Sequence, residues 1–240
     1  TIGKCGTCEE QMENRTRTLF KRLQAGRLIA LLSPARPEDC LAAWEALAPL
    51  GITLEIALRS PAAAPGIALL LEREPEALVM AGTVMTSEQA DRVIEMGVAG
   101  IVCPDYFPEV VERCVAADLL CIPGGISGVG AQLAQKARLY GCTIEELPLL
   151  YSYQYIHKLF PAITETVSFL GLASAWKGPY KGLQMVYTGG INRDNLAAAA
   201  AFDRSGIFCG SALTKAAPDR AGMRAEGEKW LALLAEKSPE

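Results

Sequence analysis

Lys158 is the side chain in this sequence with the clearest chemical potential. It lies in an aromatic and β-branched run over residues 153–160 that ends at Pro161, a pattern typical of a buried strand. Burying an ammonium without a partner is costly, whereas a neutral amine avoids that cost and is a nucleophile. Lys158 is therefore a candidate for forming a Schiff base with a carbonyl compound. The alternative is an amine that reaches water or a carboxylate at the end of the strand.

Glu55 and Arg59 could act with this lysine. Side chains alternate along a strand, so both share one face of the strand expected over residues 52–58, opposite its leucines and isoleucine. The apolar face should pack against helices, which leaves Glu55 and Arg59 pointing into the same interior as Lys158. About 13 Å of strand separates the two charged residues, too far for a simple ion pair. A buried Glu55–Lys158 pair is the structural alternative, although such pairs contribute little net stability.

Metal and redox chemistry find little support in the residue types. The single histidine, His157, falls on the strand face opposite to Lys158, so a base role is disfavoured and a histidine-based zinc site is excluded by count. A carboxylate site for magnesium is left open. Of the eight cysteines, only Cys5 and Cys8 have redox-like or ligand-like spacing, and no second pair accompanies them. We expect the other cysteines to be core thiols and the protein to need no cofactor.

Glycines follow the last two expected strands, in Thr188-Gly189-Gly190 and in Gly210-Ser211. Glycines let backbone amides approach a ligand closely, and the corresponding loops of barrels commonly hold phosphate. The alternative is that these glycines only turn the chain. Their occurrence at two consecutive strand ends favours an anionic ligand.

Short apolar runs alternate with longer helical patterns, which is the signature of repeated βα units around a parallel sheet. The expected strands span residues 28–33, 52–58, 77–81, 100–103, 119–122, 153–160, 183–187 and 206–209. Caps or acids near Pro37, Thr86 and Asn192 open three of the helices.

We therefore predict a single (β/α)8 TIM barrel over residues 1–240, with its core at about 26–215, an N-terminal helix at about 9–24 and a C-terminal helix at about 219–236. A doubly wound open sheet is the alternative, but no Gly-x-Gly-x-x-Gly follows the first strand. Residues 141–152 are interpreted as an extra helix or loop without assignable chemistry.

Composition narrows the class of protein. Half of the residues are hydrophobic and the net charge is -4, which favours a soluble globular protein and opposes nucleic-acid binding. No apolar run approaches the roughly 20 residues that span a bilayer, and the N-terminus lacks the apolar core of a signal peptide. We expect a cytoplasmic protein without nucleic-acid or membrane partners.

Several motifs, taken in order along the chain, resemble those of the KDPG/KHG aldolases, that is, 2-keto-3-deoxy-6-phosphogluconate and 4-hydroxy-2-oxoglutarate aldolases. They lie at residues 54–60, 81–84, 104, 123–127, 158–162, 188–191 and 210–211, and the likeness covers about Leu19 to Leu213. The resemblance implies a metal-independent class I aldolase, usually a homotrimer. It would cleave a 2-keto-3-deoxy or 4-hydroxy-2-keto acid, with KDPG as the expected substrate, to pyruvate and an aldehyde such as glyceraldehyde 3-phosphate or glyoxylate.

The resemblance also implies roles for single residues. Lys158 would be the Schiff-base lysine, Glu55 the proton shuttle, and Arg59 with Thr83 the clamp for the pyruvyl carboxylate. The predicted substrate-binding residues are Arg59, Thr83, Pro104, Phe160, Thr188, Gly189, Gly190, Gly210 and Ser211, of which the last five would hold a distal phosphate or carboxylate.

Three departures from the family pattern concern the far end of the substrate: Gly128 after residues 125–127, the run 163–166, and Ser33 followed by Pro34 at the end of the first strand. We therefore expect the part of the site that binds the pyruvyl half to be intact, while these departures leave the identity of the aldehyde half unassigned. Two other functions remain: a non-catalytic phosphate-binding barrel in which Lys158 only contacts an anion, and a phosphosugar isomerase or epimerase that cleaves no C–C bond.

Overall fold

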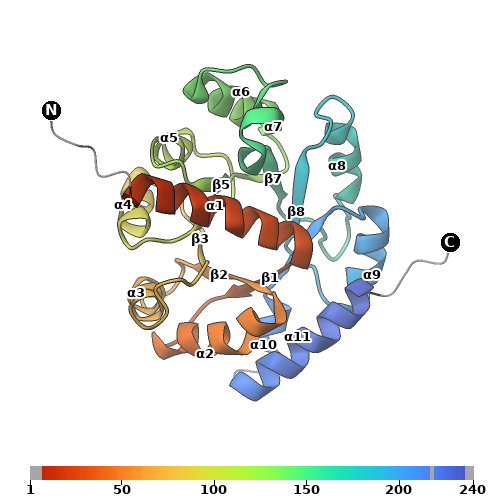
Figure 1. The fold of residues 1–240 in the computed structure, drawn as a ribbon. Helices are drawn as coiled ribbons and strands as arrows, with labels where there is room; N and C mark the ends of the chain where they lie inside the picture. The colour runs from red at the N-terminus through yellow and green to blue at the C-terminus, as the bar shows by residue number, and fades with distance from the viewer. Residues whose placement is uncertain (1–6, 217–218, 236–240) are drawn as a thin grey trace, which may run out of the picture.

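The computed structural model describes residues 7–216 and 219–235, apart from the side chains of residues 7–14. Its strands are all parallel and form one sheet in the order β5-β4-β3-β2-β1-β9-β8-β7-β6, curled into a nearly closed barrel surrounded by helices (Figure 1). The strands are β1 (Leu28–Leu32), β2 (Thr53–Ala57), β3 (Met80–Gly82), β4 (Gly100–Val102), β5 (Leu120–Ile122), β6 (Gly124–Gly125), β7 (Ile156–Leu159), β8 (Gln184–Thr188) and β9 (Ile207–Gly210).

The barrel closes at Pro123, which separates β5 from β6. On one side, the amide of Cys103 donates to the carbonyl of Ile122 at 3.0 Å, and on the other the amide of Lys158 donates to the carbonyl of Pro123 at 2.9 Å. β5 and β6 are thus two pieces of one barrel position, the first joined to β4 and the second to β7. The described strands fill the eight positions of the predicted TIM barrel, and the open-sheet alternative is wrong.

The helices also follow the expected pattern. They are α1 (Thr7–Gly26), α2 (Glu38–Leu47), η1 (Ala48–Leu50), α3 (Ala63–Arg73), α4 (Ser87–Glu95), α5 (Pro108–Ala116), α6 (Val129–Tyr140), α7 (Leu147–Leu150), η2 (Ser152–Gln154), α8 (Leu170–Lys177), α9 (Arg193–Phe202), α10 (Ala212–Lys215) and α11 (Arg220–Ala235). The hydroxyl of Thr86 accepts from the amide of Gln89 and caps α4, while Asn192 and Asn195 form a capping box at α9. The segment 141–152 contains the short helix α7.

Strand alternation divides the core into two layers. One cluster fills the barrel interior and includes Ile29, Met80, Val102, Ile122, Ile156, Val186, Ile207 and Cys209, together with Leu19, Phe20 and Leu23 of α1. The other lies between the sheet and the helices and includes Leu54, Ile56 and Leu159. Because Leu54 and Ile56 face outward, Glu55 between them faces inward, and Lys158 lies on the inner side with Ile156.

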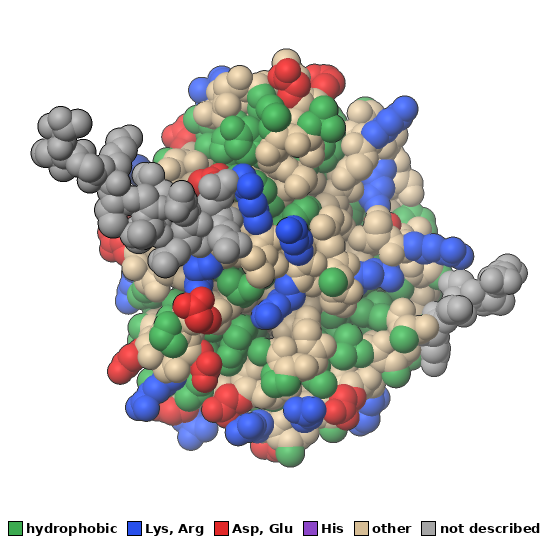
Figure 2. Space-filling model, in the orientation of Figure 1, with side chains coloured by type: hydrophobic (Ala, Val, Ile, Leu, Met, Phe, Trp, Pro, Cys, Tyr) green, Lys and Arg blue, Asp and Glu red, His purple; other side chains and the backbone are tan. Residues whose placement is uncertain are grey.

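Helix α1 covers the amino-terminal end of the barrel. Arg15 donates to the carbonyls of Pro75 and Ala77, just before β3, at 3.0 and 2.8 Å, and α1 crosses the barrel end that faces the viewer in Figure 1. Figure 2 shows the same face, with Lys and Arg side chains gathered near its centre. Helix α1 carries the exposed Arg17 and Lys21. The carboxyl ends of the strands, where barrel enzymes place their sites, lie at the opposite end.

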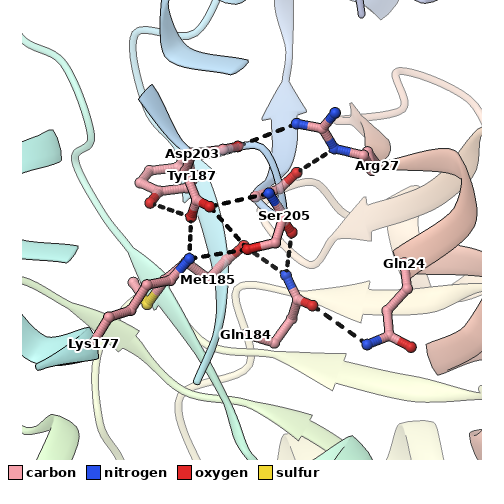
Figure 3. Close-up of polar contacts among 9 residues, drawn as sticks. Gln24, Arg27, Lys177, Gln184, Met185, Tyr187, Asp203 and Ser205 are labelled. Carbon is pink, nitrogen blue, oxygen red and sulfur yellow. Dashed lines mark hydrogen bonds and ion pairs between the residues drawn. The ribbon is translucent and has the colours of Figure 1, made fainter. Parts of the chain in front are cut away.

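A polar network near α1 fastens the end of this helix to β8 and to the loop before β9 (Figure 3). Asp203 accepts from Lys177 Nζ at 2.5 Å and from the Tyr187 hydroxyl at 2.7 Å, and the Arg27 guanidinium donates to the backbone carbonyl of Asp203 at 3.1 Å. Burial alone would raise the pKa of Asp203, but hydrogen bonds from Lys177, Tyr187 and Ser205 outweigh it and hold that pKa below its ordinary value. These bonds connect residues of α8, β8 and the loop before β9 with Arg27 at the end of α1.

The sixth strand begins later than expected. Of the predicted range 153–160, β7 starts only at Ile156, and residues up to Gln154 form the 3-10 turn η2. Side chains form hydrogen bonds here in place of backbone bonds between strands. Lys136 of α6 donates to the backbone carbonyls of Cys121 and Gln154 at 2.8 and 2.9 Å. The side-chain amide of Gln154 donates to the carbonyl of Leu119 at 2.8 Å. A donor from a distant helix therefore decides the strand boundary, which the local composition could not reveal.

We expect Lys136→Met to lower the free energy of unfolding by about 2–4 kcal/mol, because it leaves two buried carbonyls without donors. Urea denaturation followed by tryptophan fluorescence measures the change. Lys158→Met is the matched control, since it also removes a buried lysine but breaks no hydrogen bond within the described residues. Equal losses in the two variants would contradict the bracing role of Lys136.

Candidate active site

Lys158 lies inside the barrel with an available amine. The residue is 5% exposed, and within the described part of the chain its Nζ makes no hydrogen bond or ion pair. The Phe160 ring lies above it, with its centroid 5.4 Å from Nζ. Gly124, paired with Lys158 across the strands, leaves room for the side chain, since a Cβ at Gly124 would lie 2.9 Å from Lys158 Cε. The amine therefore reaches neither a carboxylate nor open solvent at the strand end, contrary to the alternative considered from sequence.

Glu55 lies on the inner face of β2 and is 3% exposed. Its carboxyl occupies the space that a side chain at position 82 would need, because a Cβ on Gly82 would lie 2.2 Å from Glu55 Oε1. Burial raises the pKa of Glu55 above its ordinary value, and the charge of Lys158, a hydrogen bond from Cys209 and the charge of Arg59 oppose that rise. The carboxyl and the amine thus lie in the same interior and interact electrostatically, and a raised pKa suits Glu55 to proton transfer.

Arg59 lies at the mouth of the barrel, so its predicted place on the inner strand face is wrong. Strand β2 ends at Ala57, and the amide of Arg59 donates back to Ala57 O at 2.7 Å, which turns the chain. The guanidinium is exposed and donates to the Ser33 hydroxyl at 2.9 Å. The charge of Arg59 opposes the rise in the pKa of Glu55, so the guanidinium remains close enough to the interior to act on this carboxyl electrostatically.

Thr83 and Pro104 border the same end of the barrel. Thr83 follows β3 with a φ of +59°, a left-handed conformation that is strained for a β-branched residue and costs of order 1–3 kcal/mol. Such strain is found mostly where function constrains the backbone. The carbonyl of Pro104 lies 2.9 Å from the Cβ position of Gly124, the same position that Lys158 Cε approaches.

The glycines at the ends of β8 and β9 are required for different structural reasons. Gly189 and Gly190 have φ values of +83° and +79°, and a Cβ on Gly190 would lie 2.0 Å from Ile163 O. Gly210, in contrast, faces outward, where a Cβ would lie 2.3 Å from the Trp230 ring of α11. Helix packing therefore accounts for the absence of a side chain at Gly210. A ligand role for its amide stays a prediction, as it does for the buried Thr188 and the half-buried Ser211.

A second buried lysine, Lys136, was not singled out by the sequence pattern. It is 0% exposed, and burial lowers its pKa to about 8. Its Nζ is engaged by the carbonyls of Cys121 and Gln154, between α6 and the barrel wall. The amine of Lys136 is bound by carbonyls on the outer side of the sheet, so it does not face the barrel interior as Lys158 does.

His157 faces away from Lys158, as predicted. It is buried against α8, edge-on to Trp176 with ring centroids 5.2 Å apart, and its Nε2 lies 3.3 Å from Gly125 O. Burial lowers its pKa to about 4, so the ring is neutral at physiological pH.

The described residues contain no group of three or more His, Cys, Asp or Glu side chains placed to hold a metal ion. Cys5 lies outside the described residues, as does the side chain of Cys8, so the prediction for this pair is not addressed. No described helix is both long and apolar enough to cross a membrane.

Three residues near the amine and the carboxyl were missed by sequence reasoning: Gly82, Gly124 and Cys209. Both glycines follow or end short strands, and that position could have suggested close approach of a side chain. Cys209 carried no such signal, because a thiol in an apolar strand is ordinary core composition.

Comparisons with known proteins identify related sequences and a related fold. A model of the family described as KDPG and KHG aldolase matches residues 19–222. The chain is 32% identical over 194 residues to 2-dehydro-3-deoxy-phosphogluconate aldolase of Treponema pallidum, covering 80% of this chain and 84% of the relative. It is 29% identical over 193 residues to the probable 2-dehydro-3-deoxy-6-phosphogalactonate aldolase of Rhizobium meliloti, covering 78% and 82%. The crystal structure of the 2-keto-3-deoxy-6-phosphogluconate aldolase of Zymomonas mobilis ZM4 has the same fold, with a TM-score of 0.72, 24% identity, and coverage of 91% of this chain and 97% of that one.

Proposed function

This chain belongs to the KDPG and KHG aldolase family, and we propose that it is a class I aldolase that cleaves a 4-hydroxy-2-keto acid to pyruvate and an aldehyde. The observation that carries the proposal is the buried amine of Lys158, which has no hydrogen-bond or ion-pair partner among the described residues and shares the barrel interior with the carboxyl of Glu55.

The chemistry begins with attack of the neutral Lys158 amine on the C2 keto carbon, and the carbinolamine then loses water to give an iminium. Glu55 takes the proton from the C4 hydroxyl, the C3–C4 bond breaks, and its electron pair moves toward the iminium to form an enamine while the aldehyde leaves. Protonation at C3 and addition of water then release pyruvate and restore the amine. The iminium is the electron sink, so no step requires a metal ion.

The roles that we propose at the two ends of the substrate follow from the family resemblance. Arg59 and Thr83 would hold the carboxylate of the pyruvyl half, a task suited to the paired donors of a guanidinium. Pro104 and Phe160 would border the reacting carbons. The distal phosphate or carboxylate would meet Thr188, Gly189, Gly190, Gly210 and Ser211, with KDPG as the expected substrate.

Trapping with pyruvate and borohydride tests the proposal. We expect one reduced pyruvyl group per chain, located by peptide mapping on Lys158. Lys136 is the internal comparison, since its amine is also buried but is bound by two backbone carbonyls. An unmodified protein, or label on Lys136 or a surface lysine, would favour a non-catalytic phosphate-binding barrel.

Pyruvate release from KDPG, from its galactonate epimer and from 4-hydroxy-2-oxoglutarate, measured side by side, identifies the aldehyde half. Turnover without pyruvate release would instead indicate a phosphosugar isomerase or epimerase. We further propose that activity survives chelators, that the protein is a homotrimer, and that it acts in the cytoplasm. Assays with chelator and light scattering of the purified protein test the first two of these proposals.

A further inference from the structure

Cys209 lies in the barrel interior, in contact with the proposed proton-transfer group. It is 1% exposed, belongs to the inner layer of the core, and its Sγ lies 3.5 Å from Glu55 Oε2. β9 carries Cys209 and is separated from β2 by β1, so the thiol reaches Glu55 across one intervening strand. The contact joins residues 154 positions apart in the sequence, which explains why no local pattern revealed it.

The two carboxyl oxygens of Glu55 are held by different means. Oε2 accepts from the Cys209 thiol, while Oε1 occupies the space left by the missing side chain of Gly82. No other hydrogen bond or ion pair to the Glu55 carboxyl occurs within the described residues. Because the carboxyl has a single hydrogen-bond donor, its orientation depends on that donor together with the close packing at Gly82.

The thiol is suited to donate rather than to accept. Burial, together with the neighbouring charge of Glu55, raises the pKa of Cys209 well above its ordinary value, so the sulfur keeps its proton at neutral pH. A hydrogen bond with Thr188, its cross-strand neighbour, opposes that rise without cancelling it. The thiol thus lies between the carboxyl and a residue predicted to meet the distal end of the substrate.

We propose that Cys209 is a positioning residue for Glu55: its thiol and the space at Gly82 together hold the carboxyl in the orientation that faces the Lys158 amine. The inference rests on the proposed function, because it gives Cys209 a catalytic consequence only if Glu55 transfers protons. It differs from a packing role, which a methyl group of similar size could perform.

The test compares Cys209→Ala, which removes the donor, with Cys209→Ser, which keeps one. Cys40→Ala is the matched control, because it removes a buried thiol of α2 that packs toward Gly66 and not toward the barrel interior. The first readout is the titration of Glu55 by 13C NMR in glutamate-labelled protein, with the Glu55 signal identified by its loss in Glu55→Gln. We expect the midpoint to move to higher pH in Cys209→Ala and to stay near the wild-type value in Cys209→Ser and Cys40→Ala.

The second readout is the pH profile of pyruvate release. Loss of one hydrogen bond should lower kcat of Cys209→Ala about fivefold with KM unchanged, and should move the acid limb to higher pH. Serine should restore most of kcat. A Cys209→Ala variant with the wild-type Glu55 midpoint and acid limb would overturn the proposal, even if it were less stable.

The two readouts separate this inference from the proposed function. If wild-type protein formed no pyruvyl adduct on Lys158 while the Glu55 midpoint still moved in Cys209→Ala, the proposed function would fail and the hold of Cys209 on Glu55 would stand. If the adduct formed and neither the midpoint nor the acid limb responded, the proposed function would stand and the role of Cys209 would fail.

Discussion

Replacing Lys158 with methionine is expected to reduce pyruvate release to background, a loss of roughly 10⁴-fold or more, because the variant lacks the amine that would form the iminium and accept electrons from the breaking bond. The thioether fills the same apolar space, and the amine it replaces has no hydrogen-bond partner among the described residues. Folding stability should therefore change by less than about 1.5 kcal/mol. Release of pyruvate, measured with a coupled dehydrogenase, and urea denaturation together check the result.

Lys158→Arg is the informative companion variant. It keeps a positive charge inside the barrel but cannot form a Schiff base. If Lys158 only contacts an anion, the arginine variant should retain much of the wild-type binding and activity. Residual activity above about one-tenth of wild type in Lys158→Arg would thus contradict the proposed role of Lys158 as a nucleophile.

Glu55→Gln has the second-largest expected effect, a fall in kcat of about 10²–10⁴-fold, because the amide cannot take the proton from the substrate hydroxyl. Bond cleavage needs the ionised carboxylate, and burial raises the pKa of Glu55. Wild-type activity should accordingly decline as pH falls through that raised value, and this acid limb should be absent from the residual activity of Glu55→Gln. Steady-state rates of pyruvate release from about pH 5 to 9 measure both effects.

Glu226→Gln is the matched control for this variant. Glu226 is also a buried carboxyl, 5% exposed, but it lies on α11, where it accepts from Trp230 at 3.0 Å and pairs with Arg193 at 2.9 Å. We expect Glu226→Gln to lower the free energy of unfolding but to leave the acid limb of the pH profile where it is in the wild type. A limb that survives in Glu55→Gln, or shifts equally in Glu226→Gln, would assign the proton transfer to another group.

The sequence was most informative where structure follows local rules. The period of two in β2 and β7 correctly placed Glu55 and Lys158 inside the barrel and His157 outside, because alternation is a property of any extended strand. Helix starts at Thr86 and Asn192 were likewise readable, since the side chain that caps a helix lies within three residues of the amide it satisfies.

Errors arose where distant segments compete with local preference. Residues 153 and 154 were expected to belong to a strand but lie in the turn η2, where the Lys136 ammonium and the Gln154 side-chain amide donate to nearby backbone carbonyls. Arg59 would face inward if β2 continued, but the chain turns after Ala57 and its guanidinium meets Ser33 from the neighbouring strand end.

By itself, the sequence determined the barrel, the inward faces of its strands, and a lysine and a glutamate directed at one interior, because hydrophobic periodicity and caps act over a few residues. Only the tertiary structure decided that the Lys158 amine lacks a partner among the described residues while Lys136 is bound by two carbonyls, and that Cys209 meets Glu55. These distinctions depend on contacts between strands and helices far apart in the chain. Such contacts leave no periodic trace in the residues that make them.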